Sequence, residues 1–136
     1  MGGLVLKLAP RERVLINGAV IENGERRSRL SIVSPNANIL RLRDAIRPGE
    51  ANTPVRRVCY IAQLILSGDA PEDTGSRQLC QGISQLMHAL NDECSLTLLR
   101  DAHRFVEEGD FYRAMKNLRT LLPREEKLFE LARKTS

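Results

Sequence analysis

The 136-residue sequence has no tryptophan, and all aromatic residues together make up only 4% of the chain. Its core must therefore be built from aliphatic side chains, which the 42% hydrophobic content can supply. No apolar run approaches the roughly 18 residues that a membrane-spanning helix needs. The N-terminal segment lacks the long apolar region and the cleavage site of a signal peptide. These absences predict a cytoplasmic protein without a membrane span.

Cysteine and histidine are scarce and do not form the patterns of a reactive site. The three cysteines, Cys59, Cys80 and Cys94, include no C-x-x-C pair, and the two histidines do not stand at i, i+4 spacing. Each cysteine lies in or beside an apolar helical pattern, which predicts a reduced, buried side chain. Neither a Walker A loop nor a dinucleotide-binding fingerprint is present. We therefore expect no metal, no cofactor and no catalytic residue, and the chain is predicted not to be an enzyme.

The net charge of +4 is distributed unevenly along the chain. Residues 1–57 contain eleven Lys and Arg against five Asp and Glu, whereas residues 58–136 contain ten against twelve. A basic front segment indicates an anionic partner, and nucleic acid is the first candidate. A surface that merely keeps the protein soluble is the alternative that charge alone leaves open.

The first 47 residues show the period-two alternation of β-strands. In residues 4–8 the leucines at positions 4, 6 and 8 share one face. Asn17-Gly18 and Asn23-Gly24 are both predicted to form tight hairpin turns, because both residue types tolerate positive φ. We therefore expect one small antiparallel sheet of five strands, over residues 4–8, 14–16, 19–21, 26–33 and 39–42.

After Arg47-Pro48-Gly49 the hydrophobic period changes to that of helices. Thr53, Asp92 and Asp110 are predicted N-caps, and Gly68 and Gly109 are predicted helix ends. Residues 70–75 are expected to form a polar loop, and the carboxylates of the adjacent Glu125 and Glu126 are expected to be solvated or to interact with a helix dipole. The predicted fold is α+β, with a basic β module over residues 1–47 and a bundle of four to five helices over residues 48–136. The helices are expected over residues 54–67, 76–90, 92–108, 110–122 and 123–134.

Arginines of the β module are the main candidates for a functional surface. Arginine offers a planar fork that binds phosphates or guanine edges and can stack on bases. Arg41 and Arg43 are predicted to share one face of the fifth strand. The absence of aromatic residues here argues against recognition by ring stacking. The candidate RNA-binding cations are Lys7, Arg11, Arg13, Arg26, Arg27, Arg29, Arg41 and Arg43.

Four long segments resemble the FlbT family of flagellar regulators. They read GLVLKLAPRERVLINGAVIENGERRSRLSI, PNANILRLRDAI, TPVRRVCYIAQLILSGD and GDFYRAMKNLRTLLPREEKL. The resemblance implies a post-transcriptional regulator, usually a repressor, of flagellin production, associated with the 5′ untranslated region of flagellin mRNA and with its translation or decay. It also implies a functional link to the protein FlaF.

A second resemblance concerns the β module alone. LVLKLAPRERVLI and LRLRDAI are similar to the first and last strands of the CsrA family of mRNA-binding regulators. This resemblance matches Arg43 to the family's strand-end arginine, and Leu6 and Lys7 to its first-strand contacts with RNA. The sequence departs from the family at Leu8, where the family has a basic residue, and at Arg11, where it has a glycine.

The helical half is predicted to bind a protein partner. Residues 111–122 resemble half of a helical hairpin repeat, and the candidate partner-binding residues are Phe111, Tyr112, Met115 and Leu118. The alternative to direct RNA binding is therefore a module that acts through FlaF or a flagellin-type partner. A homo-oligomer, with a dimer favoured, is expected because the edges of a small sheet invite pairing.

Overall fold

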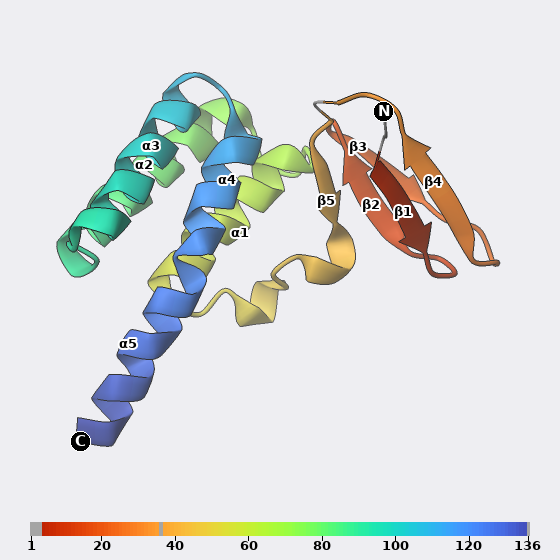
Figure 1. Cartoon of the computed structure of the whole chain (residues 1–136). Helices are drawn as coiled ribbons and strands as arrows, with labels where there is room; N and C mark the ends of the chain where they lie inside the picture. Colours follow the sequence, from red (N-terminus) through yellow and green to blue (C-terminus); the bar gives the residue numbers. More distant parts are fainter. Residues whose placement is uncertain (1–3, 36, 136) are drawn as a thin grey trace. The chain divides into compact units, whose positions relative to one another are not determined.

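The computed structural model describes residues 4–35 and 37–135 and confirms the predicted α+β class. Five strands precede five α-helices along the chain (Figure 1). The chain divides into two compact units, Met1–Ala45 and Ile46–Ser136, which we call the β unit and the helical unit.

The β unit contains two small antiparallel sheets rather than the single sheet that the sequence predicts. In one sheet β1 pairs with β4, and in the other the strand order is β3-β2-β5. A short 3-10 turn, η1 (Leu42–Asp44), follows the last strand. The strands are β1 (Leu4–Leu8), β2 (Arg13–Ile16), β3 (Ala19–Glu22), β4 (Ser28–Ile32) and β5 (Ile39–Arg41).

The two Asn-Gly pairs behave differently, and this difference splits the strands between two sheets. Asn17 and Gly18 have φ values of +48° and +86° and close the β2–β3 hairpin as predicted. The side chain of Asn23 instead donates to the carbonyl oxygens of Ala9 at 2.7 Å and Arg26 at 3.0 Å. It thereby ties the β1–β2 turn to the start of β4, which pairs with β1 and not with β3. The prediction of a second tight hairpin is therefore wrong.

Both sheets contribute to one apolar cluster. Leu6, Leu8 and Val14 are buried at its centre. Leu4, predicted to share the face of Leu6 and Leu8, is 54% exposed at the start of β1. Partly buried side chains surround the centre, namely Ile16, Leu30, Ile32 and Ile39.

In the helical unit α1 packs against α2 and α4, and α3 packs against the same two helices. These four helices enclose an aliphatic core, while α5 continues beyond them (Figure 1). Among the described residues, no helix has the length and apolar character needed to cross a membrane. The helices are α1 (Pro54–Leu66), α2 (Glu72–Ala89), α3 (Glu93–Glu107), α4 (Phe111–Thr120) and α5 (Leu122–Thr135), and a 3-10 turn, η2 (Pro48–Glu50), precedes α1.

The predicted helix caps are confirmed. The side chains of Thr53, Asp92 and Asp110 each accept a hydrogen bond from a backbone N–H three residues further on. Gly68 and Gly109 follow α1 and α3 with φ values of +82° and +78°, which favour glycine.

Helix α2 begins at Glu72, four residues before the predicted start at residue 76. Gly75 therefore lies inside the helix and not in the predicted loop. A Cβ atom at this position would lie 2.6 Å from the Ile65 side chain, which explains why the residue is glycine. Gly82 likewise faces Val58, at 2.5 Å from such a Cβ atom. Both glycines therefore permit the close approach of α1 and α2.

The cysteines do not share one environment, although the sequence predicts that all three are buried. Cys59 is buried, Cys80 is partly buried and Cys94 is exposed. Burial raises the pKa of the Cys59 thiol to about 12, so that this thiol stays protonated and unreactive at neutral pH. Cys94 lies in the first turn of α3, on its solvent side.

Glu125 is buried and not solvated, so that of the two predicted alternatives the interaction with a helix dipole is the one that its contacts match. Its carboxylate accepts hydrogen bonds from the Thr53 hydroxyl and, at 2.8 Å, from the backbone N–H of Val55. A free N–H group at the start of a helix is a favourable partner for a carboxylate. The first turn of α5 is thereby fixed to the N-terminus of α1.

Candidate nucleic-acid interface

The structure divides the candidate RNA-binding residues by their local partners. Some are paired with glutamates of the β unit, Leu6 is buried, and others are exposed and have no carboxylate partner among the described residues. This division separates cations that hold the β unit together from cations that can meet a ligand.

Arg11 and Arg13 are neutralised at the surface. The Arg13 Nε atom lies 2.9 Å from a carboxylate oxygen of Glu22, which faces it across β2 and β3. The Arg11 Nη2 atom lies 3.0 Å from Glu25. Arg11 also has a φ of +61°, in the left-handed region that favours glycine. The positive charges of these two arginines are therefore largely compensated by the neighbouring glutamates.

Arg41 is the most enclosed of the candidate arginines and forms a structural clamp with Glu12. Its Nε and Nη2 atoms each donate to the Glu12 carboxylate at 2.8 Å, and Nη2 also donates to the Lys7 carbonyl at 2.7 Å. The side chains of Arg41 and Glu12 are only 18% and 6% exposed. Glu12 further accepts from the backbone N–H of Ala9, at 3.0 Å. This clamp joins β1, the β1–β2 turn and β5.

The hydrogen bonds of the clamp favour the charged form of Glu12. The Ala9 N–H first, and the Arg41 guanidinium second, lower the pKa of the Glu12 carboxyl below its usual value. The guanidinium of Arg41 is therefore bonded to a glutamate and a backbone carbonyl and is mostly shielded from solvent.

The predicted shared face of Arg41 and Arg43 does not exist. Strand β5 ends at Arg41, and Leu42–Asp44 forms the 3-10 turn η1, which changes the direction of the following side chain. Arg43 is 59% exposed, and its Nε atom is 3.9 Å from both Glu12 and Asp44. At these distances the guanidinium keeps most of its donors available.

Leu6 is also corrected, because its side chain is only 6% exposed and belongs to the apolar cluster of the β unit. The alternation of β1 places Leu6 inward and Lys7 outward. Of the two first-strand residues that the sequence predicts as RNA contacts, only Lys7 can thus present its side chain to a ligand.

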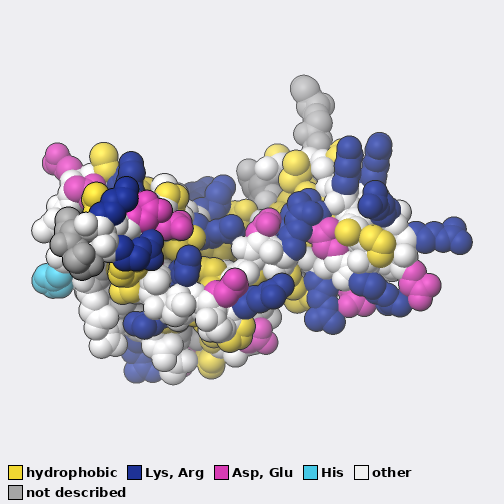
Figure 2. All heavy atoms as spheres, turned by 90° about the horizontal axis from the view of Figure 1, so that it is seen from below, with side chains coloured by type: hydrophobic (Ala, Val, Ile, Leu, Met, Phe, Trp, Pro, Cys, Tyr) yellow, Lys and Arg dark blue, Asp and Glu magenta, His cyan; other side chains and the backbone are white. Residues whose placement is uncertain are grey.

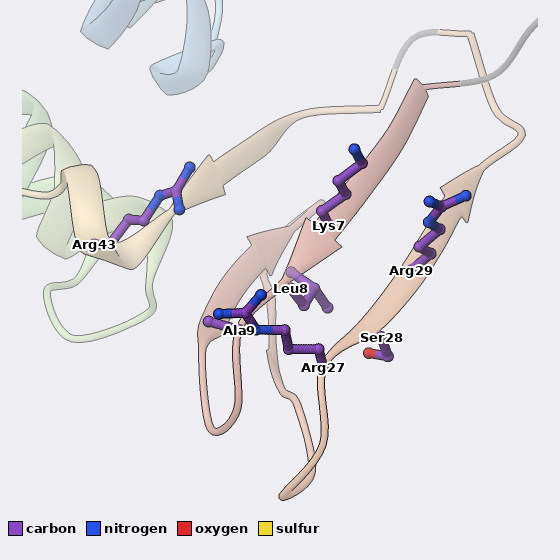
Figure 3. Close-up of a pocket in the computed structure, with 7 residues that line it drawn as sticks. All are labelled: Lys7, Leu8, Ala9, Arg27, Ser28, Arg29 and Arg43. Carbon is purple, nitrogen blue, oxygen red and sulfur yellow. The ribbon is translucent and has the colours of Figure 1, made fainter.

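Four cations line one open cavity of about 380 Å³, which we call the cationic pocket. Lys7 projects from β1, Arg29 from β4, Arg27 from the segment before β4, and Arg43 from η1 (Figure 3). Among residues 4–35 and 37–135, Lys7, Arg27 and Arg29 have no carboxylate within ion-pair distance. The remaining lining residues are Leu8, Ala9 and Ser28.

The pairing of β1 with β4 places Lys7 directly opposite Arg29. Like charges at opposed positions of an antiparallel pair destabilise the sheet. The β unit nevertheless leaves this pair without a glutamate, although its glutamates neutralise Arg11, Arg13 and Arg41. Lys and Arg side chains gather over the surface of the β unit in Figure 2. The arrangement suits a multiply charged anion.

Arg26 is exposed and has no ion pair among the described residues, but it does not line the cationic pocket. The sequence cannot separate paired arginines from exposed, unpaired ones, because the glutamates that pair with them come from other segments of the chain. The glutamates at positions 12, 22 and 25 indicate that some arginines are paired, but the tertiary fold decides which arginine each glutamate meets. Ala9 and Ser28 line the pocket and were missed, since neither residue type indicates a site.

The predicted partner-binding residues of α4 lie mostly inside the helical core. Phe111, Met115 and Leu118 are 6%, 1% and 0% exposed. Their side chains are therefore unavailable to a partner in this fold, which corrects the prediction for these three. Tyr112 is partly exposed.

The structure thus defines an α+β protein in which a β unit with an open cationic pocket precedes a helical unit. Residues 4–129 match the family model described as "Flagellar protein FlbT", and the chain belongs to this family. This confirms the resemblance seen in the sequence.

Several named relatives are similar over most of their length. A "Probable flagellum biosynthesis repressor protein FlbT 1" of Bradyrhizobium diazoefficiens is 34% identical over 92% of this chain and 84% of its own. A "Probable flagellum biosynthesis repressor protein FlbT" of Chelativorans sp. is 30% identical over 94% of this chain and 87% of its own. The "Flagellum biosynthesis repressor protein FlbT" of Caulobacter vibrioides is 24% identical over 90% of this chain and 86% of its own. No solved structure matches the chain.

Proposed function

We propose that this chain is a post-transcriptional repressor of flagellin synthesis that binds the 5′ untranslated region of flagellin mRNA through the cationic pocket. The relatives named as flagellum biosynthesis repressors support the repressor role. The observation that carries the RNA-binding part is the opposed pair Lys7 and Arg29, which lies beside Arg27 and has no carboxylate partner in the part of the chain that the structure describes. Such a site gains free energy when phosphates approach, because they relieve the mutual repulsion of the cations.

The pocket suits single-stranded RNA better than a flat duplex surface. The lining of this open cavity of about 380 Å³ includes the apolar residues Leu8 and Ala9 beside the cations. A phosphate can meet the lysine and arginine donors while a neighbouring base lies against an apolar lining residue or an arginine plane. Residues 1–45 contain no Phe, Tyr or Trp, so that stacking on aromatic rings has no place in this unit.

Arg43 lines the same pocket, and its guanidinium is a further bidentate donor, from η1 near the end of the β unit (Figure 3). Its guanidinium is held loosely near Glu12, which the Arg41 clamp already occupies. RNA binding therefore requires no rearrangement of the clamp, and Arg41 serves to keep Lys7 and Arg43 on the same cavity.

The test compares two double variants of the full chain that remove equal charge from the same unit. Arg27→Ala/Arg29→Ala removes two of the four cations of the pocket, whereas Arg11→Ala/Arg13→Ala removes two arginines that are paired with glutamates. Alanine at position 11 keeps a Cβ atom, so that the strain of its positive φ is unchanged. Binding of labelled flagellin leader RNA is followed by fluorescence anisotropy over a series of salt concentrations.

We expect the pocket variant to lose about tenfold or more in affinity. Its salt dependence should become shallower by about 1.4 log units per log unit, as two single-strand phosphate contacts would give. The paired-arginine variant should change much less. Equal losses in both variants would reduce the effect to overall charge and contradict the pocket. No binding of leader RNA even at low salt would favour the alternative, a protein-interaction module that acts through FlaF or a flagellin-type partner.

A further inference from the structure

The cationic pocket concentrates more positive charge than one internal phosphate of RNA can neutralise. Four cations, Lys7, Arg27, Arg29 and Arg43, line a cavity of about 380 Å³ (Figure 3). Among the described residues, this lining includes no Asp or Glu. An internal phosphodiester carries only about one negative charge, and the backbone spreads these charges along the strand. The pocket therefore favours a ligand that gathers several negative charges in one group.

A polar cross-link at Asn23 holds two walls of the pocket together. The amide nitrogen of Asn23 donates to the carbonyl oxygens of Ala9 at 2.7 Å and Arg26 at 3.0 Å. The amide oxygen of the same side chain accepts from the Ser28 hydroxyl at 2.7 Å. Ala9 follows β1, and Arg26 and Ser28 flank Arg27. Asn23 thereby fixes the segment that carries Arg27 beside the end of β1.

The clamp at Arg41 holds the remaining cations. The Nη2 atom of Arg41 donates to the Lys7 carbonyl at 2.7 Å, and Arg43 follows two residues later in η1. Both cross-links form when the β unit folds, so that the mutual repulsion of the cations is overcome before a ligand arrives. The site is thus preorganised, and the ligand that relieves the most repulsion gains the most.

A terminal polyphosphate provides the required concentration of charge. A 5′-triphosphate carries about four negative charges at neutral pH, about one on each inner phosphate and about two on the last. Arginine binds phosphate oxygens with a bidentate fork, and lysine binds them as a point charge. An unprocessed transcript keeps the triphosphate of its first nucleotide. This group therefore stands at the very start of a 5′ untranslated region.

The size of the cavity agrees with an end group. Pockets that hold small molecules have volumes of about 300–1,000 Å³, and the cationic pocket lies at the lower end of this range. A triphosphate can enter such a cavity while the rest of the RNA leaves through its open side. The surface arginines Arg11 and Arg13 offer no second site of this kind, because glutamates already pair with them.

We propose that the cationic pocket binds a terminal polyphosphate, namely the 5′-triphosphate of an unprocessed flagellin transcript. This inference rests on the proposed function, because it names the part of the 5′ untranslated region that enters the pocket. A free nucleoside triphosphate carries the same chemical group and would compete with the RNA end for the same cations.

The test compares leader RNAs of one sequence that differ only in the 5′ end, which is a triphosphate, a monophosphate or a hydroxyl. A fluorophore at the 3′ end reports binding to the full chain by fluorescence anisotropy, in buffer without divalent cations. We expect the triphosphate RNA to bind about tenfold or more tightly than the hydroxyl RNA, with the monophosphate RNA between them. A hydroxyl RNA lengthened by about four nucleotides carries a similar added charge and should gain much less.

Two variants show whether the preference comes from the pocket. Arg27→Ala/Arg29→Ala should bind the three RNAs with nearly equal affinity, because two of the four cations are gone. Arg11→Ala/Arg13→Ala removes the same charge from paired positions and should keep the preference for the triphosphate end. A preference that both variants retain would place the triphosphate outside the pocket and overturn the proposal.

Unlabelled ATP separates the two sources of the polyphosphate. Displacement of triphosphate RNA only at far higher ATP concentration supports the RNA end as the ligand. Displacement at equal concentration supports the polyphosphate site and assigns it to free nucleotide. Equal affinity for all three 5′ ends overturns the inference, although a loss of RNA binding in Arg27→Ala/Arg29→Ala would then still support the proposed function. Binding of ATP without binding of any leader RNA would contradict the proposed function and retain the polyphosphate site.

Discussion

The two units of this protein use charge in opposite ways. In the helical unit the ion pairs are mostly solvent-exposed neighbours on one helix, such as Arg104 with Asp101 and Arg113 with Asp110, and such pairs contribute little to stability. In the β unit the Glu12–Arg41 pair is nearly enclosed and connects three segments of the chain. The helical unit is held by apolar volume, whereas the small β unit adds polar cross-links to a short core. Lys7, Arg27 and Arg29, which take no part in these polar cross-links, line the cationic pocket.

The strongest test of this contrast removes apolar volume from the helical unit. Leu118 is 0% exposed, and Leu118→Ala should lower the free energy of unfolding of this unit by about 2–5 kcal/mol. Chemical denaturation followed by circular dichroism measures the loss. Leu128→Ala, the same substitution at a half-exposed position, serves as the control and should cost far less. Equal effects would show that Leu118 is not part of a packed core.

A smaller effect is expected where two helices approach most closely. Gly82→Ala places a Cβ atom 2.5 Å from the Val58 side chain, so that α1 and α2 must separate or Val58 must move. We expect a loss of about 1–3 kcal/mol in the free energy of unfolding. Gly49→Ala, at a glycine with open space around it, should change stability little. A Gly82→Ala protein as stable as wild type would contradict the close α1–α2 contact.

The smallest and most selective effect concerns the β unit and depends on pH. The folded-state pKa of Glu12 lies below its usual value of 4.5, and therefore the clamp stabilises the fold fully above that pH. This stabilisation is lost as the pH falls through the lowered pKa. Glu12→Gln should remove the acid-dependent part, so that the variant is less stable than wild type at neutral pH and approaches it in acid. The backbone amide signals of β1 and β5 in NMR spectra report this unit separately.

Glu25→Gln provides the control for the clamp. Glu25 also pairs with an arginine, Arg11, but its side chain is 80% exposed, where water screens the interaction. We expect almost no change in the pH dependence of the β unit. If the two glutamine variants behaved alike, the distinction between an enclosed clamp and a surface pair would fail.

Local chemistry made much of the fold predictable. The caps at Thr53, Asp92 and Asp110 and the Asn17-Gly18 hairpin follow from short-range hydrogen bonding and backbone sterics, which depend on neighbours in the sequence. The sequence pattern places Gly75 in a loop because the contact that requires glycine there is with Ile65 on another helix. The pattern also predicts a hairpin at Asn23, whose actual partners Ala9 and Arg26 become close only when β4 pairs with β1.

The sequence by itself determined the α+β class, the basic character of the first half, the family and the set of cations from which a site could be drawn. Only the tertiary structure decided that Arg41 is held by Glu12 and that Lys7 faces Arg29 with no carboxylate partner among the described residues. It also decided that the apolar residues of α4 are buried whereas Leu128 and Leu131 of α5 are exposed. The physical reason is the sequence distance over which each interaction acts. Propensity and capping act between neighbours, whereas the charge and burial of a side chain depend on which distant segments fold against it.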